Sequence, residues 1–280
     1  MLKQRILTAL ILGPLIIWSV LAFSHKALAI EMGLVLMLAG WEWARLAGIQ
    51  KQPGRVIYAF VVGSFLLMLT WLIHSHVNLL KPILYTASAW WVVATLLIIV
   101  ANRKKIIATD NVSLSAMLLN LLVGILILSG AFIGIVAMHS VGGYGENYIL
   151  ILLILIWVAD SSAYFAGKAF GKHKLAANVS PGKTWEGVMG GMLATILVAY
   201  IIGLYLKFDS ALIFYFVVTA VVSIGFSIVG DLIESLFKRR TGVKDSSQLL
   251  PGHGGILDRI DSLLSAAPLF LLGLLLVGIK

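Results

Sequence analysis

The stretch from Leu114 to Met138 reads LSAMLLNLLVGILILSGAFIGIVAM and decides the class of fold. It contains no Asp, Glu, Lys or Arg. An apolar run of this length can cross the roughly 30 Å of hydrocarbon in a bilayer as a single helix. We therefore expect a transmembrane helix here.

Similar apolar stretches lie on both sides of this segment. Four precede it, over residues 6–23, 27–48, 56–73 and 83–101, and four follow, over 148–167, 184–206, 211–237 and 261–279. With 60% hydrophobic residues, 12% charged residues and a mean hydropathy of +1.02, the chain is too apolar to keep its surface in water. The sequence predicts an all-α, polytopic integral membrane protein with about nine transmembrane helices.

The composition also excludes several kinds of site. The chain has no cysteine, which rules out disulfides, thiolate zinc sites and cysteine nucleophiles. Lys3 and Arg5 before the first apolar run could mark a signal peptide, but no small-x-small cleavage site with a soluble domain follows. We interpret this run as a retained first span.

The basic residues are distributed unevenly between the two sides of the predicted membrane. A net charge of +9 would suggest nucleic acid in a soluble protein, but here it reflects topology and lipid contact first. Of the 21 Lys and Arg residues, all but Lys26, Lys81, Lys207 and Lys280 lie on the side of the N-terminus. Because Lys and Arg in short loops resist translocation, we expect a cytoplasmic N-terminus and, with an odd number of spans, an external C-terminus.

Most acidic residues gather on the same cytoplasmic side, at the ends of spans or in the two largest loops. They are Asp160, Glu186, Asp231, Glu234, Asp245, Asp258 and Asp261. A charge some turns inside a span usually faces a wet or protein-lined cavity, although each carboxylate could instead be an interfacial charge paired with Lys or Arg. Together with the nearby cations, the group favours a site for magnesium and phosphates.

Helical spacing places several of these residues on common faces. Asp231, Glu234, Ser235 and Lys238 follow an i, i+3, i+4, i+7 pattern, which puts them on one helix face. Asp258 and Asp261 are related as i and i+3 if helix begins before the last span. The pair Gly187 and Gly191, like Gly167 and Gly171, fits G-x-x-x-G and predicts close helix packing.

Two motifs identify a family that the chain resembles. Ser235-Leu-Phe-Lys238-Arg239 is followed by Lys244-Asp245 and then by Pro251-Gly-His253-Gly254-Gly255-Ile-Leu-Asp258-Arg259-Ile-Asp261. With every spacing kept, this segment resembles the signature of the phosphatidate cytidylyltransferase (CDP-diacylglycerol synthase) family. Ser180-Pro-Gly182-Lys183-Thr184-Trp-Glu186-Gly187 resembles a second motif, in which position 182 is more often basic. The segments 157–168 and 2–6 also look like this family.

The resemblance implies an enzyme that transfers CMP from CTP to phosphatidic acid, giving CDP-diacylglycerol and pyrophosphate in phospholipid biosynthesis. It implies CTP, phosphatidic acid and membrane lipids as partners, excludes nucleic acid and leaves a homodimer open. The expected location is the bacterial inner (plasma) membrane, with the active site cytoplasmic. Residues 1–280 are expected to form one membrane domain, in which 1–138 are N-terminal transmembrane helices and 148–280 are catalytic helices and cytoplasmic loops.

The resemblance also suggests a role for each candidate residue. Asp231 and Asp258 are the first candidates to bind Mg²⁺, and Asp245 and Asp261 come next, with a second cation left open. The expected phosphate binders are Lys183, Lys238, Arg239, Lys244 and Arg259. Ser180 and Thr184 are expected to donate to the triphosphate, and the amides of Gly254 and Gly255 to approach phosphate oxygens closely. His253 either contacts a phosphate or orders the loop, while Asp160, Glu186, Glu234 and Ser235 support the site. Lys238, Lys244 and Asp245, with Asp231 and Asp258, form the expected catalytic group.

Other classes of protein were weighed against this interpretation. A secondary transporter would place its carboxylates near the midplane between internal repeats, whereas here they crowd one face and no repeat is visible. A CTP-dependent polyprenol or lipid kinase would transfer the γ-phosphoryl group and release CDP. A purely structural membrane protein would not explain the signature segment.

Overall fold

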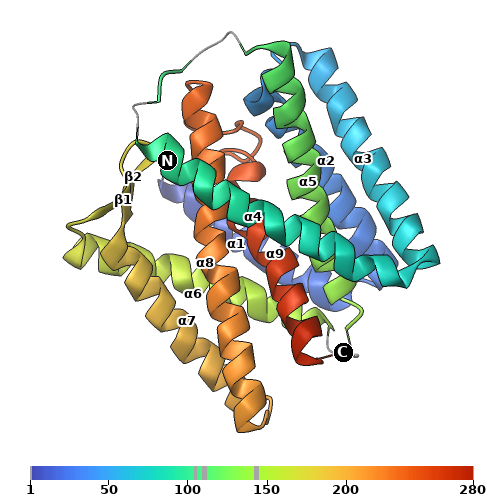
Figure 1. Cartoon of the computed structure of the whole chain (residues 1–280), viewed down its shortest axis with the longest axis vertical. Helices are drawn as coiled ribbons and strands as arrows, with labels where there is room; N and C mark the ends of the chain where they lie inside the picture. Colours follow the sequence, from blue (N-terminus) through green and yellow to red (C-terminus); the bar gives the residue numbers. More distant parts are fainter. Residues whose placement is uncertain (1, 104–105, 109–111, 142–144, 280) are drawn as a thin grey trace.

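The computed structural model describes residues 2–103, 106–108, 112–141 and 145–279, and helices dominate these ranges (Figure 1). The elements are α1 (Leu2–Ala22), α2 (His25–Ala47), α3 (Gln52–Ser75), η1 (Val77–Leu79), α4 (Leu80–Asn102), α5 (Leu114–Met138), α6 (Gly145–Phe170), β1 (Lys174–Ala176), β2 (Ser180–Thr184), α7 (Trp185–Tyr205), α8 (Ser210–Arg240) and α9 (Leu257–Val277). Lys104, Lys105 and Lys280, which the charge distribution includes, lie outside the described residues.

The helices have the length and the surface of membrane spans. In the described ranges, 8 of them, α2 to α9, are long and apolar enough to cross a bilayer, while the described apolar part of α1, Leu10–Ala22, is shorter. Large apolar side chains such as Trp71 of α3, Leu193 of α7 and Phe214 of α8 are exposed. Such faces suit lipid and not water. The prediction of an all-α, polytopic membrane protein is confirmed.

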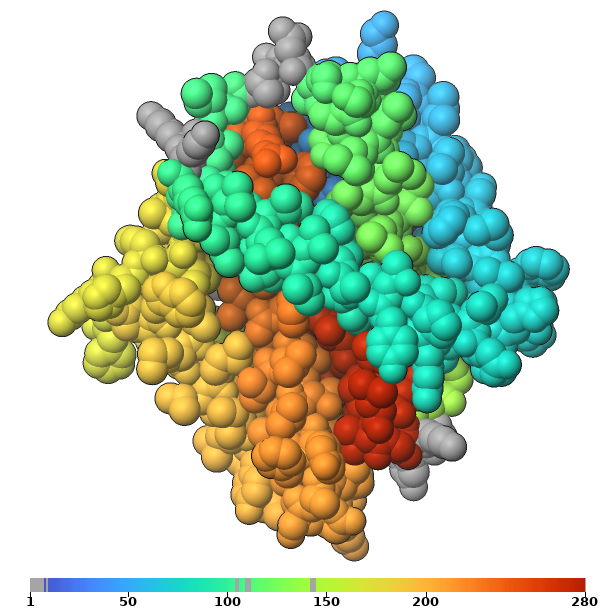
Figure 2. All heavy atoms as spheres, in the orientation of Figure 1, coloured from blue at the N-terminus to red at the C-terminus, as the bar shows by residue number. Residues whose placement is uncertain are grey.

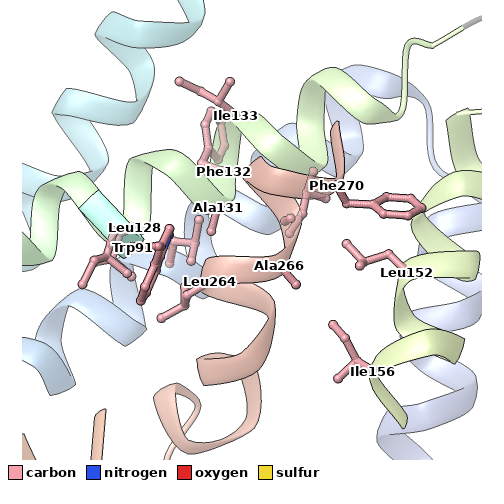
Figure 3. Close-up of a cluster of buried hydrophobic side chains, with 14 of the residues drawn as sticks. Trp91, Leu128, Ala131, Phe132, Ile133, Leu152, Ile156, Leu264, Ala266 and Phe270 are labelled. Carbon is pink, nitrogen blue, oxygen red and sulfur yellow. The ribbon is translucent and has the colours of Figure 1, made fainter. Parts of the chain in front are cut away.

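Two long C-terminal helices, α8 and α9, pack side by side at the centre of the molecule. Helix α5 packs against α9 and α2, and α6 and α7 form a pair that joins the centre through α8. Helix α4 crosses over α8 and α9 and covers the middle of one face, beyond which α7 and α8 extend (Figure 2). Trp91 of α4, Leu128 of α5, Leu152 of α6 and Phe270 of α9 meet in the buried core (Figure 3). Helices from both halves of the sequence therefore share one core.

The α6–α7 pair depends on glycine. A Cβ at Gly187 would lie 2.8 Å from the carbonyl oxygen of Ala163, and one at Gly191 would lie 2.9 Å from that of Ala159. Real Cβ atoms are almost never found so close to a backbone oxygen. The prediction that this G-x-x-x-G pair serves close packing is confirmed.

A short hairpin interrupts the helical pattern between α6 and α7, where the sequence predicted only a loop. Strands β1 and β2 are antiparallel, with Lys174 opposite Thr184 and Ala176 opposite Ser180. The buried side chains of Ala176 and Val179 hold the turn against the core. Strands of 3 and 5 residues carry too little alternation to be recognised from sequence.

Candidate active site

A cavity of about 770 Å³ opens where α6 and α8 end and α7 and α9 begin. Its walls come from α6, β2, α7, α8, the loop 241–256 and α9. Predicted site residues that line it are Asp160, Lys183, Thr184, Asp231, Ser235, Lys238, Arg239, Lys244, Asp245, Asp258, Arg259 and Asp261. Ala163, Tyr164, Val188 and Ile228 add apolar surface to the lining. The fold thus gathers charges of both signs beside a surface that suits a lipid.

Residues on one face of α8 line the cavity. The Ser235 hydroxyl donates to Asp231 Oδ1 at 3.2 Å, one turn back along the helix. Lys238 Nζ lies 2.7 Å from Glu234 Oε2 and 2.7 Å from Asp258 Oδ1 of α9. The predicted common face of these residues is confirmed, and Lys238 joins the two central helices through a buried ion pair on each side.

The carboxylate of Asp258 holds the loop 241–256 against α9. Its Oδ1 binds the ammonium of Lys238. Its Oδ2 accepts hydrogen bonds from the Ser246 amide at 2.9 Å, the Ser246 hydroxyl at 2.9 Å and the Gly255 amide at 2.8 Å. Gly254 has φ +83°, and a Cβ there would lie 2.7 Å from Asp258 Oδ2. Glycine is therefore required beside this carboxylate for both conformational and steric reasons.

The hairpin delivers Lys183 to the cavity. Lys183 Nζ lies 2.6 Å from Asp231 Oδ2, and both side chains remain partly exposed. The turn of the hairpin is tied to the end of α4, because Asn178 donates from its amide to Asn102 Oδ1 at 3.0 Å and from Nδ2 to the Asn102 carbonyl at 2.7 Å. The hairpin, which the sequence does not predict, thus positions a predicted phosphate binder.

The structure adds a residue that the sequence analysis did not single out. Glu42 of α2 is fully buried and accepts hydrogen bonds from the Leu257 amide at 2.6 Å, the Ile256 amide at 3.0 Å and the Ser246 hydroxyl at 3.1 Å. The hydroxyl of Ser247 donates to it as well. Applying to Glu42 the rule used for Asp160 and Asp231, that a charge inside a span has a partner, would have found it.

Comparison with known proteins assigns this arrangement to a family. The sequence profile described as "Cytidylyltransferase family" matches residues 3–277. The chain belongs to this family. It is 42% identical over 270 residues to a phosphatidate cytidylyltransferase of Pseudomonas aeruginosa, covering 96% of each chain. It is 36% identical over 288 residues to a protein of the same name from Haemophilus influenzae, covering 96% of this chain and 97% of that one. A third, from Staphylococcus saprophyticus, is 42% identical over 147 residues, or 52% of this chain and 55% of that protein.

Some predicted site residues of this cytidylyltransferase-family chain lie outside the cavity lining. They are Ser180, Glu186, Glu234, His253, Gly254 and Gly255. Glu186 lies 2.6 Å from Nδ1 of His173 and closes the base of the hairpin, while Ser180 pairs with Ala176 at its other end. Glu234 is paired with Lys238, and its Oε1 is buried without a hydrogen-bond partner in the part of the chain that the structure describes. Through these contacts Ser180, Glu186 and Glu234 support the cavity wall in this structure.

The glycine-rich loop uses its amides differently from the prediction. The Gly255 amide donates to Asp258 and the next two amides donate to Glu42, so protein carboxylates take these donors instead of phosphate. The Nδ1 atom of His253 is buried and has no hydrogen-bond partner among the described residues. Thr184 caps α7 by accepting from the Gly187 amide at 3.2 Å, and it also lines the cavity.

The carboxylates of the cavity have the right chemistry for magnesium. Asp231, Asp245, Asp258 and Asp261 supply hard oxygen ligands around one space, which is the donor type that Mg²⁺ prefers. Within the described part of the chain, no three His, Asp or Glu side chains are grouped closely enough to hold an ion. Lys183 and Lys238 are instead paired with Asp231 and Asp258. The type of donor suits the ion, whereas in this structure two of the four carboxylates are paired with ammonium groups.

Proposed function

We propose that the chain transfers CMP from CTP to phosphatidic acid, forming CDP-diacylglycerol and releasing pyrophosphate. The observation that carries this proposal is the match to phosphatidate cytidylyltransferases over 96% of the chain. The cavity agrees with it, because two anionic reactants, one of them a lipid, need cations beside an apolar wall at the end of the helices.

The chemistry needs no covalent intermediate with the protein. A phosphatidate oxygen attacks the α-phosphorus of CTP and pyrophosphate leaves, so that catalysis reduces to positioning and neutralisation of charge. Cavity cations that are suited to the phosphates are Lys183, Lys238, Arg239, Lys244 and Arg259. The Lys238 ammonium is already fixed by Glu234 and Asp258, so it does not have to be ordered when substrate binds.

We propose Mg²⁺ as the cofactor. Asp231 and Asp258 with Asp245 and Asp261 would hold it, and a bound ion would neutralise phosphate charge as a Lewis acid. Asp258 is the most heavily hydrogen-bonded of the four in this structure, which leaves Asp231, Asp245 and Asp261 as the more available ligands. A second cation remains part of the same proposal.

We further propose that the protein lies in the bacterial inner membrane with its N-terminus and cavity in the cytoplasm and its C-terminus outside. The charge distribution supports this orientation. In support of it, the cavity is lined by residues at the C-terminal ends of α6 and α8, and the hairpin beside it is bonded to the end of α4, where many of the basic residues lie. A homodimer stays a prediction, which cross-linking in native membranes would test.

Product analysis tests the activity. Purified protein is incubated with Mg²⁺, phosphatidic acid and CTP labelled either in the cytidine or in the γ-phosphate. Cytidine label in the lipid fraction together with labelled pyrophosphate is the expected result. Label from the γ-phosphate in the lipid, with release of CDP, would instead identify a lipid kinase.

A further inference from the structure

Glu42 holds together two parts of the chain that are distant in sequence. It is fully buried in α2, and its hydrogen-bond donors are 204 to 215 residues further along the chain. They comprise two backbone amides at the start of α9 and the hydroxyls of Ser246 and Ser247. Among the described residues Glu42 forms no ion pair, and a buried carboxylate is costly unless its hydrogen-bond donors are kept in place.

The Ser246 side chain connects Glu42 to the cavity. Its hydroxyl oxygen lies 3.1 Å from Glu42 Oε2 and 2.9 Å from Asp258 Oδ2, and its amide donates to the same Asp258 oxygen at 2.9 Å. Asp258 in turn fixes the ammonium of Lys238 at 2.7 Å. The single proton of this hydroxyl is shared between the two carboxylates, so a continuous set of polar contacts runs from α2 to a cation that lines the cavity, while Glu42 itself is absent from the lining.

The same carboxylate occupies the N-terminus of α9. The amides of Ile256 and Leu257 point to its two oxygens, and this end of a helix otherwise attracts anions. With Glu42 in place, the first turn of α9 is fixed by an internal anion and is not offered to a substrate phosphate. Asp258 and Asp261 both belong to the first turns of this helix.

We propose that Glu42 is a positioning residue for CMP transfer: it sets the first turn of α9 and, through Ser246, the position of the Asp258 carboxylate and of Lys238. The reaction named in this inference rests on the proposed function, whereas the hydrogen bonds of Glu42 do not depend on it. The competing interpretation is that Glu42 is a placeholder that leaves when a CTP phosphate takes the α9 amides. The two interpretations predict different kinetic effects of substituting Glu42. A positioning residue changes kcat, whereas a placeholder changes KM for CTP.

The first test compares Glu42→Gln with Glu31→Gln, at equal amounts of folded protein in detergent. Glu31 lies in the same helix and has no hydrogen-bond or ion-pair partner in the described part of the chain. Gln offers only one acceptor oxygen to donors that now share two. We expect Glu42→Gln to lower kcat by about tenfold or more with KM for CTP within about threefold, and Glu31→Gln to change neither. A large change in KM for CTP with normal kcat would overturn positioning in favour of the placeholder.

The second test is a double-mutant cycle that still works if Glu42→Gln is poorly stable. Ser246→Ala removes the hydroxyl that lies between Glu42 and Asp258, keeps the amide of residue 246 on Asp258 and leaves the three other donors to Glu42 intact. If Glu42 acts through Ser246, the single variants both lower kcat and the double variant is little worse than the more impaired of them. Fully additive losses would overturn the link, as would normal turnover of Ser246→Ala.

Hydrogen exchange separates failure of this inference from failure of the proposed function. In Glu42→Gln the amides of residues 246 and 255–257 should exchange faster than in the wild type and in Glu31→Gln, whatever reaction the protein catalyses. Unchanged exchange would overturn the positioning role. If exchange rises as expected while the wild-type protein forms no CDP-diacylglycerol, the activity is wrong and the geometric role of Glu42 stands.

Discussion

At the scale of single residues, Asp258 is the cavity carboxylate with the most hydrogen-bond donors around it. Its two oxygens receive Lys238, two donors of Ser246 and the Gly255 amide. We expect Asp258→Asn to lower turnover about a hundredfold or more, because the amide cannot accept from all these donors and cannot neutralise the ammonium or hold Mg²⁺. Initial rates over a series of Mg²⁺ concentrations measure this.

Asp209 is the matched control for that substitution. It caps α8 at the other end of the bundle by accepting from the Leu212 amide at 2.8 Å, and Asn is as good an N-cap as Asp. Asp209→Asn should therefore keep its activity. If Asp258→Asn and Asp231→Asn both retained normal turnover and Mg²⁺ dependence, the metal assignment would be wrong although the family is right.

Lys238 allows stability and catalysis to be separated. Lys238→Met leaves Glu234 buried without its cation, and breaking a buried ion pair in this way typically costs about 3–5 kcal/mol. The double variant Lys238→Met with Glu234→Met removes both charges and should recover much of the lost thermal stability in detergent. It should remain inactive, because the cation beside Asp258 is still missing. Recovery of both stability and activity would contradict a role for Lys238 in the reaction.

How far the site could be predicted differs from residue to residue. The face of α8 with Asp231, Ser235 and Lys238 follows from the helical period, which is a local property of the sequence. The bonds of Glu42 join residues more than 200 positions apart, so no spacing rule could pair them. The sequence predicts that the amides of Gly254 and Gly255 approach phosphate, and it does not reveal that Asp258 takes the Gly255 amide.

At the scale of elements, the α6–α7 contact can be tested through its glycines. Gly191→Val would push a branched side chain against the Ala159 carbonyl and separate the helices, at a cost of about 1–3 kcal/mol. We expect a lower melting temperature in detergent. Gly33→Ala in α2, where a Cβ would meet nothing within 4 Å, should be neutral or slightly stabilising. An equal fall in melting temperature in both variants would mean that helix propensity, and not packing, determines the stability at these glycines.

Helices could be predicted in this chain and strands could not, for a physical reason. Each span needs about 20 apolar residues, so its signal is long and survives local irregularities. The hairpin needs only a few backbone pairs, and it is stabilised by the Asn102–Asn178 contact and by burial of Val179, which are tertiary interactions. Its consequence for function, the placement of Lys183, was therefore also invisible in the sequence.

At the scale of the whole molecule, the orientation in the membrane is open to direct test. A reporter that is active only outside the cytoplasm should work when fused after Lys280 and fail when inserted at residues 103–105. The reason is that the basic residues are concentrated on one side of the bundle. Activity at both positions, or the reverse pattern, would overturn the orientation and place the cavity on the other side of the membrane.

The long-range bonds of Glu42 also impose an order on biosynthesis. A ribosome that adds about 5–20 residues per second needs roughly 10–40 s to travel from Glu42 to its partners in the last loop and helix. During that interval the second helix sits in the translocon or the bilayer without the hydrogen-bond donors that its acidic side chain has in the folded structure. The finished enzyme can therefore form only after its final helix emerges, and a prematurely terminated chain is left with an exposed defect that membrane quality control can recognise.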